Sequence, residues 1–338
     1  MNEFKQYFRT HLKGNLRAIV CIFAAVLVLT FLLGMNEQKT IYYNYHLEKT
    51  ITSYHSTLYI PVIFLCILAY VLPIMEFSFF KKRINLDCAY ALPISRRAMG
   101  AVHYLTGLMI LFGAFTASYL LNFILLLRWE AGIFYFLPMI PHYFLCLLLG
   151  FAIYALMVFV FNEANTKGDG IWFIALYTFA FELIVIAIAT LTEKWSIAVF
   201  MGVPWGPIDW ITTNFQYLVE RSNEFYSGYG STAANIVWLI FWVIIGIAAA
   251  LGFFLTFGKR RMEQTEEISD SYFGFRTLIP IYAISSMLFL RDADSIILLS
   301  IIELFAILGY TIYRRGFRYK KSDIIWLCVF LIFLFIGV

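Results

Sequence analysis

The sequence predicts an all-α polytopic membrane protein, and three observations support this fold class. Hydrophobic residues make up 62% of the 338 residues and charged residues only 14%, whereas about 25% charged residues are typical of soluble proteins. The mean hydropathy is +0.80, which means that the chain has more apolar surface than a soluble domain of this size can bury. The long apolar runs lack the period-2 alternation of barrel strands, which favours helices. A cytosolic enzyme, a disulfide-stabilised domain and a disordered chain are therefore excluded.

Nine apolar runs are the expected membrane helices, because about 20 apolar residues cross a bilayer. They are 18–35, 58–80, 102–127, 144–161, 171–191, 235–257, 278–290, 296–313 and 324–338. No small-residue cleavage site follows the first run before Asn36, so we expect a retained anchor and not a signal peptide. The seventh and ninth runs are short, so we expect them to tilt little, to thin the bilayer or to dip without crossing.

The basic residues favour a cytoplasmic N-terminus, since inner loops of membrane proteins are enriched in Lys and Arg. If the nine runs alternate in direction, 19 of the 25 basic residues fall on the side of the N-terminus and 6 on the other side. The net charge of +4 then follows from topology, and we expect no nucleic-acid partner.

The sequence contains no motif that indicates catalysis, metal binding or nucleotide binding. The five cysteines lie in spans or in an inner loop, which predicts no disulfide framework. No CxxC or HExxH motif occurs and the five histidines are scattered, so we expect no metal site. The segment 252–259 has the wrong spacing for a phosphate-binding loop, and Arg260 follows its lysine. We therefore expect no catalytic residues, no cofactor in this chain and no enzyme activity of the chain by itself.

The N-terminal segment 1–16 has two helical stripes. One is aromatic and apolar and the other is basic: Phe4, Tyr7, Phe8 and Leu12, then Lys5, Arg9 and Lys13. This pattern predicts an amphipathic helix that lies on the inner leaflet with its cations at the headgroups. The alternative is a short basic flank that only sets the topology.

The inner loop 81–97 reads KKRINLDCAYALPISRR. A basic start is followed by a short amphipathic stretch that contains Asp87. Pro93 ends any helix before it, and Ser95 can cap the helix that runs into the third span. A folded element at this place would suit docking of a cytosolic partner. A solvated basic loop that holds the topology is the equal alternative.

The run 77–97 resembles the ABC-2 type exporter permeases of Gram-positive bacteria. In that family this loop is the coupling helix that docks on the ATP-binding subunit. The resemblance therefore implies an ATPase-coupling role for six residues, namely Asp87, Tyr90, Leu92, Pro93, Ser95 and Arg96. Segment 1–16 is similar to the family's elbow helix. Segment 258–267, GKRRMEQTEE, is similar to a basic-acidic stretch of the family but lacks its usual glycine.

The resemblance covers about the first 270 residues, and together with the apolar runs it predicts the organisation of the chain. A six-helix ABC-2 type permease core (17–257) would be followed by an inner linker (258–276) and about three C-terminal membrane helices (277–338). The expected partners are two copies of an ATP-binding cassette subunit, which would hold ATP and Mg, a second permease that is identical or related, and the lipid bilayer of a bacterial cell.

The outer stretch 192–232 is rich in aromatic residues that suit a membrane interface: Trp195, Trp205, Trp210, Phe215 and Tyr217. Pro204, Gly206 and Pro207 break it into two pieces. A short hairpin that dips into the outer leaflet is predicted. The resemblance implies re-entrant helices that close the exit side, with Trp205, Pro207 and Trp210 among them. An interfacial loop that rests on lipid is the alternative.

Two acidic residues fall in the middle of apolar runs, Glu182 in the fifth and Glu303 in the eighth, and Glu76 lies nearer an inner end. A charge in a span costs a few kcal/mol, so each side chain should face protein or water. Glu182 and Glu303 can line a translocation path or carry protons. The alternative, preferred for Glu303, is a protonated acid that is hydrogen-bonded between helices.

These expectations combine into a permease subunit of an ATP-driven exporter, which receives motion through the loop between spans two and three. A proton-coupled secondary transporter that uses Glu182 is the alternative, although the two halves show no repeat of the kind common in such proteins. An intramembrane enzyme would need paired catalytic residues, and we identify none. The aromatic, acid-poor spans suit amphipathic or lipid-like cargo.

Overall fold

The computed structural model describes residues 2–35, 39–44, 49–54, 58–127, 136–192, 202–219, 232–259, 263, 265–290 and 296–336. The chain divides into two compact units. Unit 1 contains Met1–Glu76, Leu92–Leu156 and Trp205–Gly258. Unit 2 contains Phe77–Ala91, Met157–Pro204 and Lys259–Val338.

Within the described residues, seven helices are long and apolar enough to cross a membrane. They are Glu3–Met35, Tyr59–Lys81, Arg96–Leu125, Met139–Glu163, Lys167–Thr192, Ile236–Phe257 and Ile297–Arg314. The predicted fold class, a helical multi-pass membrane protein, is thereby confirmed. The two runs predicted to be short form α9 (Phe275–Phe289) and α11 (Lys321–Ile336), with 15 and 16 residues. At 1.5 Å per residue they are about 22–24 Å long, against about 30 Å for the hydrocarbon core.

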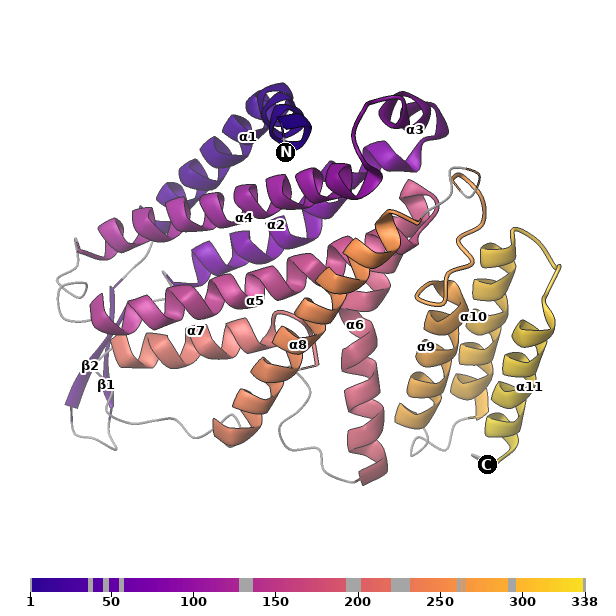
Figure 1. Cartoon of the computed structure of the whole chain (residues 1–338). Coiled ribbons are helices and arrows are strands. Elements are labelled where there is room, and N and C mark those ends of the chain that lie inside the picture. The colour runs from indigo at the N-terminus through magenta and orange to yellow at the C-terminus, as the bar shows by residue number, and fades with distance from the viewer. Residues whose placement is uncertain are drawn as a thin grey trace. The chain divides into compact units, whose positions relative to one another are not determined.

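Unit 1 is built around packed helices (Figure 1). Its elements are α1 (Asn2–Met35), β1 (Lys39–Asn44), β2 (Lys49–Tyr54), α2 (Tyr59–Phe77), α4 (Arg96–Leu127), the first part of α5 (Phe136–Glu163), α7 (Gly206–Val219) and α8 (Thr232–Phe257). The helix α1 packs along α4. Their contact is close because Gly113 leaves room for Phe23, whose Cζ would lie 2.7 Å from a Cβ at that position.

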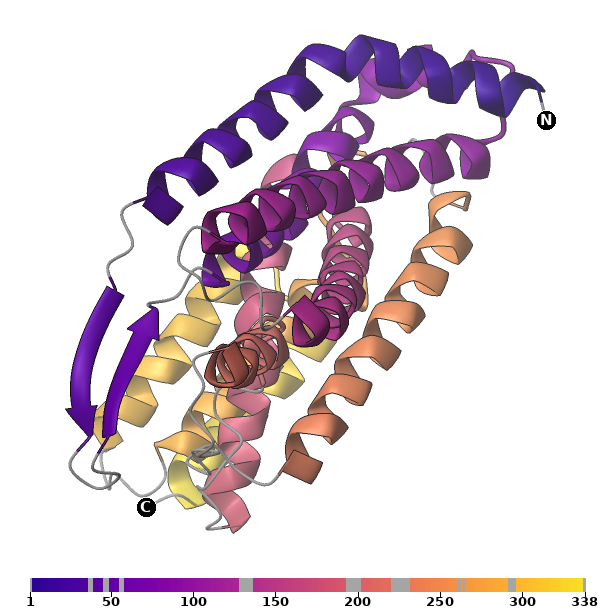
Figure 2. The same ribbon diagram turned by 90° about the vertical axis from the view of Figure 1, so that its left-hand side faces the viewer.

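The N-terminal helix is longer than the sequence predicts. Residues 2–16 of the predicted segment are helical, but α1 continues without a break from Asn2 to Met35. It changes direction along its length, as Figure 2 shows. One continuous helix therefore joins the amphipathic segment to the first apolar run.

A β-hairpin, which the sequence analysis did not predict, lies between α1 and α2. Strands β1 and β2 pair antiparallel from Lys39↔Tyr54 to Asn44↔Lys49. Their sequences, KTIYYN and KTITSY, are rich in the β-branched and aromatic residues that favour strands. The hairpin is short, so the fold class is unchanged.

Unit 2 contains the 3-10 helix η1 (Ser78–Lys81), α3 (Arg83–Tyr90), the second part of α5, α6 (Lys167–Thr192), α9, α10 (Ile296–Arg314) and α11. The helix α6 packs on α9, and α9, α10 and α11 lie side by side (Figure 1). Their shared core is apolar and aromatic, with Met287, Leu299, Ala306, Tyr310 and Phe330 at its centre.

Candidate functional site

A short helix stands between the second and third long apolar helices, in the predicted coupling loop. It is α3, and it ends at Tyr90, before Pro93. Ser95 then begins α4, because its Oγ accepts a hydrogen bond from the N–H of Ala98 at 3.3 Å. The helix break at Pro93 and the cap at Ser95 confirm the sequence prediction for this turn.

The start of this loop is attached to the end of α5. Lys81 is buried, with 3% exposure, and its Nζ donates to the carbonyls of Asn162 at 3.1 Å and Ala164 at 2.5 Å. These carbonyls belong to the C-terminal end of α5, where a cation is favourable. The Lys81 ammonium also lies 5.0 Å from the centre of the Phe161 ring. The predicted basic start of the loop is thus partly a helix cap.

The linker after α8 forms a second attachment of α3. The Arg83 N–H donates to Glu266 Oε1 at 3.3 Å, and its guanidinium donates to the Glu263 carbonyl at 3.2 Å. The same linker contacts the turn between α5 and α6, where the N–H of Asn165 donates to Ser269 Oγ at 2.8 Å. We call the segment 263–271 the strap. The sequence predicted a basic-acidic linker here but not that it would hold α3.

One face of α3 is left exposed. Leu86 and Ala89 are buried, whereas Ile84 is 74% exposed and Asp87 is also exposed. Ile84 and Asp87 are three residues apart and share a helix face. The other predicted coupling residues, Leu92, Pro93, Ser95 and Arg96, are each exposed. The Tyr90 side chain lies outside the described part of the chain. An exposed apolar side chain beside an acid can form a docking surface.

In the predicted re-entrant region the structure describes α7 and the turn before it. Pro207 is in the first turn of α7, a position that proline favours, and Trp210 is half-buried. The 193–201 and 220–231 segments, with Trp195, lie outside the described residues, so the predicted hairpin is not tested. The side chains of Phe215 and Tyr217 also lie outside them.

The helix α7 runs antiparallel to α2. At its start the Trp205 ring lies 6.3 Å from the Tyr70 ring, centre to centre. Near its middle the hydroxyls of Thr213 and Tyr59 are hydrogen-bonded. Tyr59 and Tyr70 are separated by about 16 Å along α2. The start of α7 therefore lies beside the second half of α2, well away from the end that begins at Tyr59. A re-entrant helix is expected to reach this depth.

An apolar cavity of about 490 Å³ lies between α2 and α7 within unit 1. Tyr70, Trp205 and Cys66 line it, and among the described residues Asp209 is its one acidic lining residue. A space of this size and character suits an acyl chain or another apolar group.

The two acids predicted to lie inside spans have different surroundings within unit 2. Glu182 lies against the turn that precedes α7: a Cβ on Gly202 would come 2.5 Å from Glu182 Oε2 and 2.8 Å from its Cα. The N–H groups of Gly202 and Val203 interact with its carboxylate, yet Oε2 is buried without a hydrogen-bond partner in the described chain. Glu303 on α10 is buried. The interhelical hydrogen bond preferred for it is not found among the described residues.

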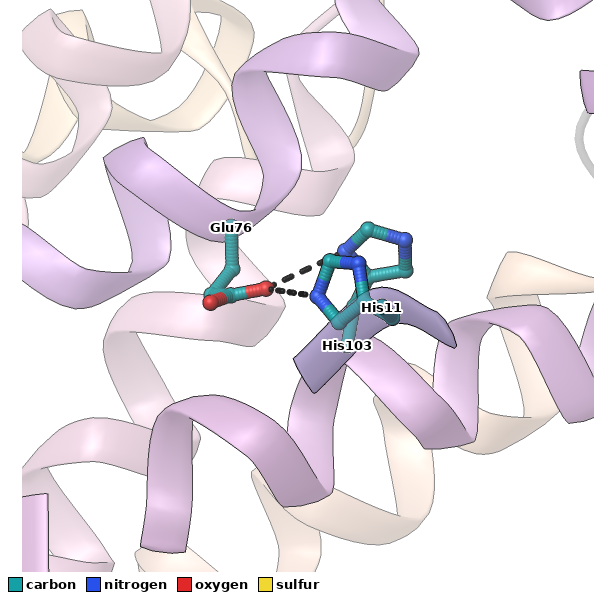
Figure 3. A group of neighbouring side chains, drawn as sticks. All are labelled: His11, Glu76 and His103. Atoms are coloured by element: carbon teal, nitrogen blue, oxygen red, sulfur yellow. Dashed lines mark hydrogen bonds and ion pairs between the residues drawn. The ribbon is translucent and has the colours of Figure 1, made fainter. Parts of the chain in front are cut away.

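A cluster that the sequence did not predict lies in unit 1, where His11, Glu76 and His103 come from α1, α2 and α4 (Figure 3). Glu76 Oε2 lies 2.9 Å from His11 Nε2 and 3.2 Å from His103 Nδ1. The Tyr7 hydroxyl lies 3.2 Å from His103 Nε2, and Asn15 Nδ2 lies 3.1 Å from His11 Nε2.

The expectation of scattered histidines is therefore wrong for two of the five. The three residues are far apart in sequence, so no motif spacing could reveal them. The available signal was Glu76 itself, because an acid inside the end of a span requires a polar partner.

A separate ionic network in unit 2 joins Asp270 of the strap to Arg314 and Lys320. Arg314 donates through Nε to Asp323 Oδ2 at 2.7 Å and through Nη2 to Oδ1 at 2.9 Å. Arg314 also pairs with Asp270 at 3.6 Å, and Lys320 bonds to the same carboxylate. Burial raises the pKa of Asp270, but hydrogen bonds from Lys320 and Tyr313 outweigh it, so its pKa is below the usual value. This network joins the start of α9 to the end of α10.

Comparisons with protein-family models, with curated proteins and with solved structures give no match for this chain. Its function is therefore argued from its own residues.

Proposed function

We propose that this chain is the membrane-spanning permease subunit of an ATP-binding cassette exporter in a bacterial cell membrane, with its N-terminus in the cytoplasm. The proposal rests on the position and the exposed face of α3. This is a short helix between the second and third long apolar helices, attached to its own unit on one side and exposed at Ile84 and Asp87 on the other. A loop that only sets topology requires neither feature.

In this proposal, two ATP-binding subunits dock on α3 and the adjoining turn 92–96. They hold ATP and Mg, for which this chain has no motif. Their closure would move α3, and the motion would reach α2 through η1 and α4 through the Ser95 cap. The Lys81 and Arg83 contacts would carry it to the end of α5 and to the strap. Such coupling requires that ATP favour one state of the complex over another.

The proposed path lies between this permease and a second one, identical or related. The α7 region, with Trp205, Pro207 and Trp210, would close its exit side, because α7 starts deep along α2 and returns toward the end of α2 that begins at Tyr59. Glu182 would be a polar group of the path. The cavity between α2 and α7 favours amphipathic or lipid-like cargo.

A proton-coupled secondary transporter is the second candidate, and one observation favours it. Glu182 has a buried carboxylate oxygen without a hydrogen-bond partner in the described chain, and such an acid can bind and release a proton. This candidate requires that Glu182→Gln abolish transport by the chain alone in liposomes under a proton gradient.

Isolation of the native complex tests the proposal. We expect a stoichiometric ATPase partner that is lost from the Ile84→Glu/Asp87→Arg double variant. The matched control is Phe317→Glu, which changes another exposed side chain (82% exposed) and should retain the partner. Retention of the partner by the double variant would refute docking at α3. Substrate movement by the chain alone, driven by a proton gradient without ATP, would refute the exporter proposal as a whole.

A further inference from the structure

The His11–Glu76–His103 cluster brings together three potential metal ligands that the transport proposal does not use. Each residue offers one ligand atom, and these atoms all lie within 4.8 Å of one another. Figure 3 shows the side chains converging from three separate helices. The convergence depends on the packing of α1 against α2 and α4, and not on a local loop.

The distances between the ligand atoms suit a tetrahedral ion. Zinc binds nitrogen and carboxylate oxygen at about 2.0–2.2 Å, so two ligands of a tetrahedral zinc lie about 3.3 Å apart. In the cluster, Glu76 Oε2 lies 2.9 Å from His11 Nε2 and 3.2 Å from His103 Nδ1. The third pair, the two imidazole nitrogens, lies within the 4.8 Å that encloses all three ligand atoms.

A residue beside the cluster, Tyr7, supports the same assignment. A metal-binding histidine usually donates its second ring N–H to a neighbouring oxygen, which leaves the first nitrogen free to coordinate. The Tyr7 hydroxyl lies 3.2 Å from His103 Nε2 and can accept that hydrogen, leaving the Nδ1 lone pair directed toward Glu76.

Burial and charge favour a bound cation. The side chains of Glu76 and His103 are each 6% exposed. In the part of the chain that the structure describes, no Lys or Arg forms an ion pair with Glu76, whose ion-pair partners are the two imidazoles. A buried carboxylate requires a compensating positive charge, which a divalent ion held by two neutral imidazoles would supply. The His11 side chain is 13% exposed, so an ion can reach the cluster from the surface of unit 1.

We propose that His11, Glu76 and His103 bind one divalent transition-metal ion of the zinc class, with water completing the coordination. Two imidazoles and one carboxylate match zinc and related first-row ions, whereas Mg²⁺ and Ca²⁺ prefer oxygen ligands. The bound ion would cross-link α1 to α2 and α4 and stabilise their packing. In the sequence, α2 and α4 flank the loop that contains α3. The site is independent of whether the chain is an exporter subunit.

Cobalt titration of the full chain in lipid nanodiscs, after removal of metals with a chelator, tests the site. We expect one equivalent of Co²⁺ to bind with the visible d–d absorption of a low-coordinate ion, and one equivalent of Zn²⁺ to remove it. Glu76→Gln and His103→Asn should abolish the absorption. Tyr7→Phe, which keeps all three ligands, should weaken binding by about 10–100-fold. Zn²⁺ should also raise the unfolding temperature of the wild type.

The matched control is His142→Gln, since His142 is another buried histidine of unit 1 and should leave the cobalt spectrum unchanged. A wild-type chain without saturable Co²⁺ absorption would overturn the proposal, and the cluster would then be a hydrogen-bonded triad only. Unchanged absorption in His103→Asn would overturn it equally. If Glu76→Gln does not fold, the wild-type spectrum and the Tyr7→Phe titration decide.

Discussion

Lys81 shows how a single residue can position the loop that follows it. Its ammonium is buried and donates to two carbonyls at the end of α5. A side-chain cation is favourable at this place, because the last turn of a helix ends in carbonyls that its own N–H groups do not reach. The next residue, Lys82, is exposed. Two adjacent lysines that look equivalent in the sequence therefore have different physical roles.

Replacing Lys81 with Met keeps the apolar stem and removes the donor. Hydrogen bonds from a charged donor contribute about 1.5–3 kcal/mol each, and Lys81 makes two of them, so we expect Lys81→Met to lower the free energy of unfolding by about 3–6 kcal/mol. Thermal unfolding of the purified protein in detergent measures this. Lys82→Met is the control and should stay within about 0.5 kcal/mol of the wild type. Equal effects of the two substitutions would contradict the assigned cap.

Gly246 in α8 is a position where even one added methyl group would not fit. A Cβ there would lie 2.4 Å from the Cα of Ala152 in α5, and backbone cannot move aside as a side chain can. We expect Gly246→Ala to destabilise the protein by about 1–3 kcal/mol through overpacking. Gly14→Ala in α1, where a Cβ would meet nothing within 4 Å, should stabilise by up to about 1 kcal/mol. Chemical denaturation in mixed micelles compares them, and destabilisation by both would argue against the tight contact.

Among the elements, α7 has a position on which the proposed closure of the exit side depends. Its contacts place Thr213 beside Tyr59, at the start of α2, and Trp205 beside Tyr70, about 16 Å further along that helix. An interfacial loop that rests on lipid would keep both residues at one depth. The difference in depth can be measured without knowledge of the substrate.

In a background without the native cysteines, a thiol reagent that cannot cross membranes should label Thr213→Cys from outside the cell and leave Trp205→Cys unlabelled. The reason is that Thr213 lies beside Tyr59 at the start of α2, whereas Trp205 lies beside Tyr70, about 16 Å further along α2. Unfolding the protein in denaturing detergent before labelling should make both cysteines react, which controls for intrinsic reactivity. Equal labelling of both positions in intact cells would show that α7 lies at the interface.

The sequence predicts elements better than contacts between them. Apolar length and the Pro93–Ser95 turn are local signals, and the helices they predicted are present. The strap could not be predicted, because the Arg83–Glu266 contact joins residues that no periodicity relates. The same holds for His11, Glu76 and His103. The strands β1 and β2 have only a weak local signal, the Thr and Tyr content of six residues each, and strand propensity depends strongly on context.

At the scale of the molecule, contacts within unit 2 test the predicted alternation of the spans. Lys81 joins the end of η1 to the end of α5, and Arg83 joins α3 to the strap. The strap in turn joins the start of α9 to Arg314 at the end of α10, through Asp270. Four segments that the basic residues predict to share one side of the membrane are thus in contact, and contact is possible only if they share that side.

The Asp270 network makes the stability of unit 2 dependent on pH in the acid range. Because the pKa of Asp270 is lowered in the folded state, its contribution is present above the unfolded value of about 3.9 and is lost as pH falls through the lower folded value. We expect the unfolding temperature to fall below about pH 4, and Asp270→Asn to make this fall shallower. The exposed Asp87→Asn is the control and should keep the wild-type slope. A steeper fall in Asp270→Asn would reverse the assigned sign.

The same contacts predict the side on which the chain leaves the membrane after α11. Asp270 before α9 and Arg314 at the end of α10 are paired, so α9 and α10 form a pair that returns to the side it started from. Asp323 in the first turn of α11 bonds Arg314, which starts α11 on that side too. We therefore expect a reporter fused after residue 336 to lie opposite one fused after residue 318. Alkaline phosphatase, active only outside the cytoplasm, should be active in the first fusion and inactive in the second. Inactivity of both would show that the 16 residues of α11 do not cross the bilayer.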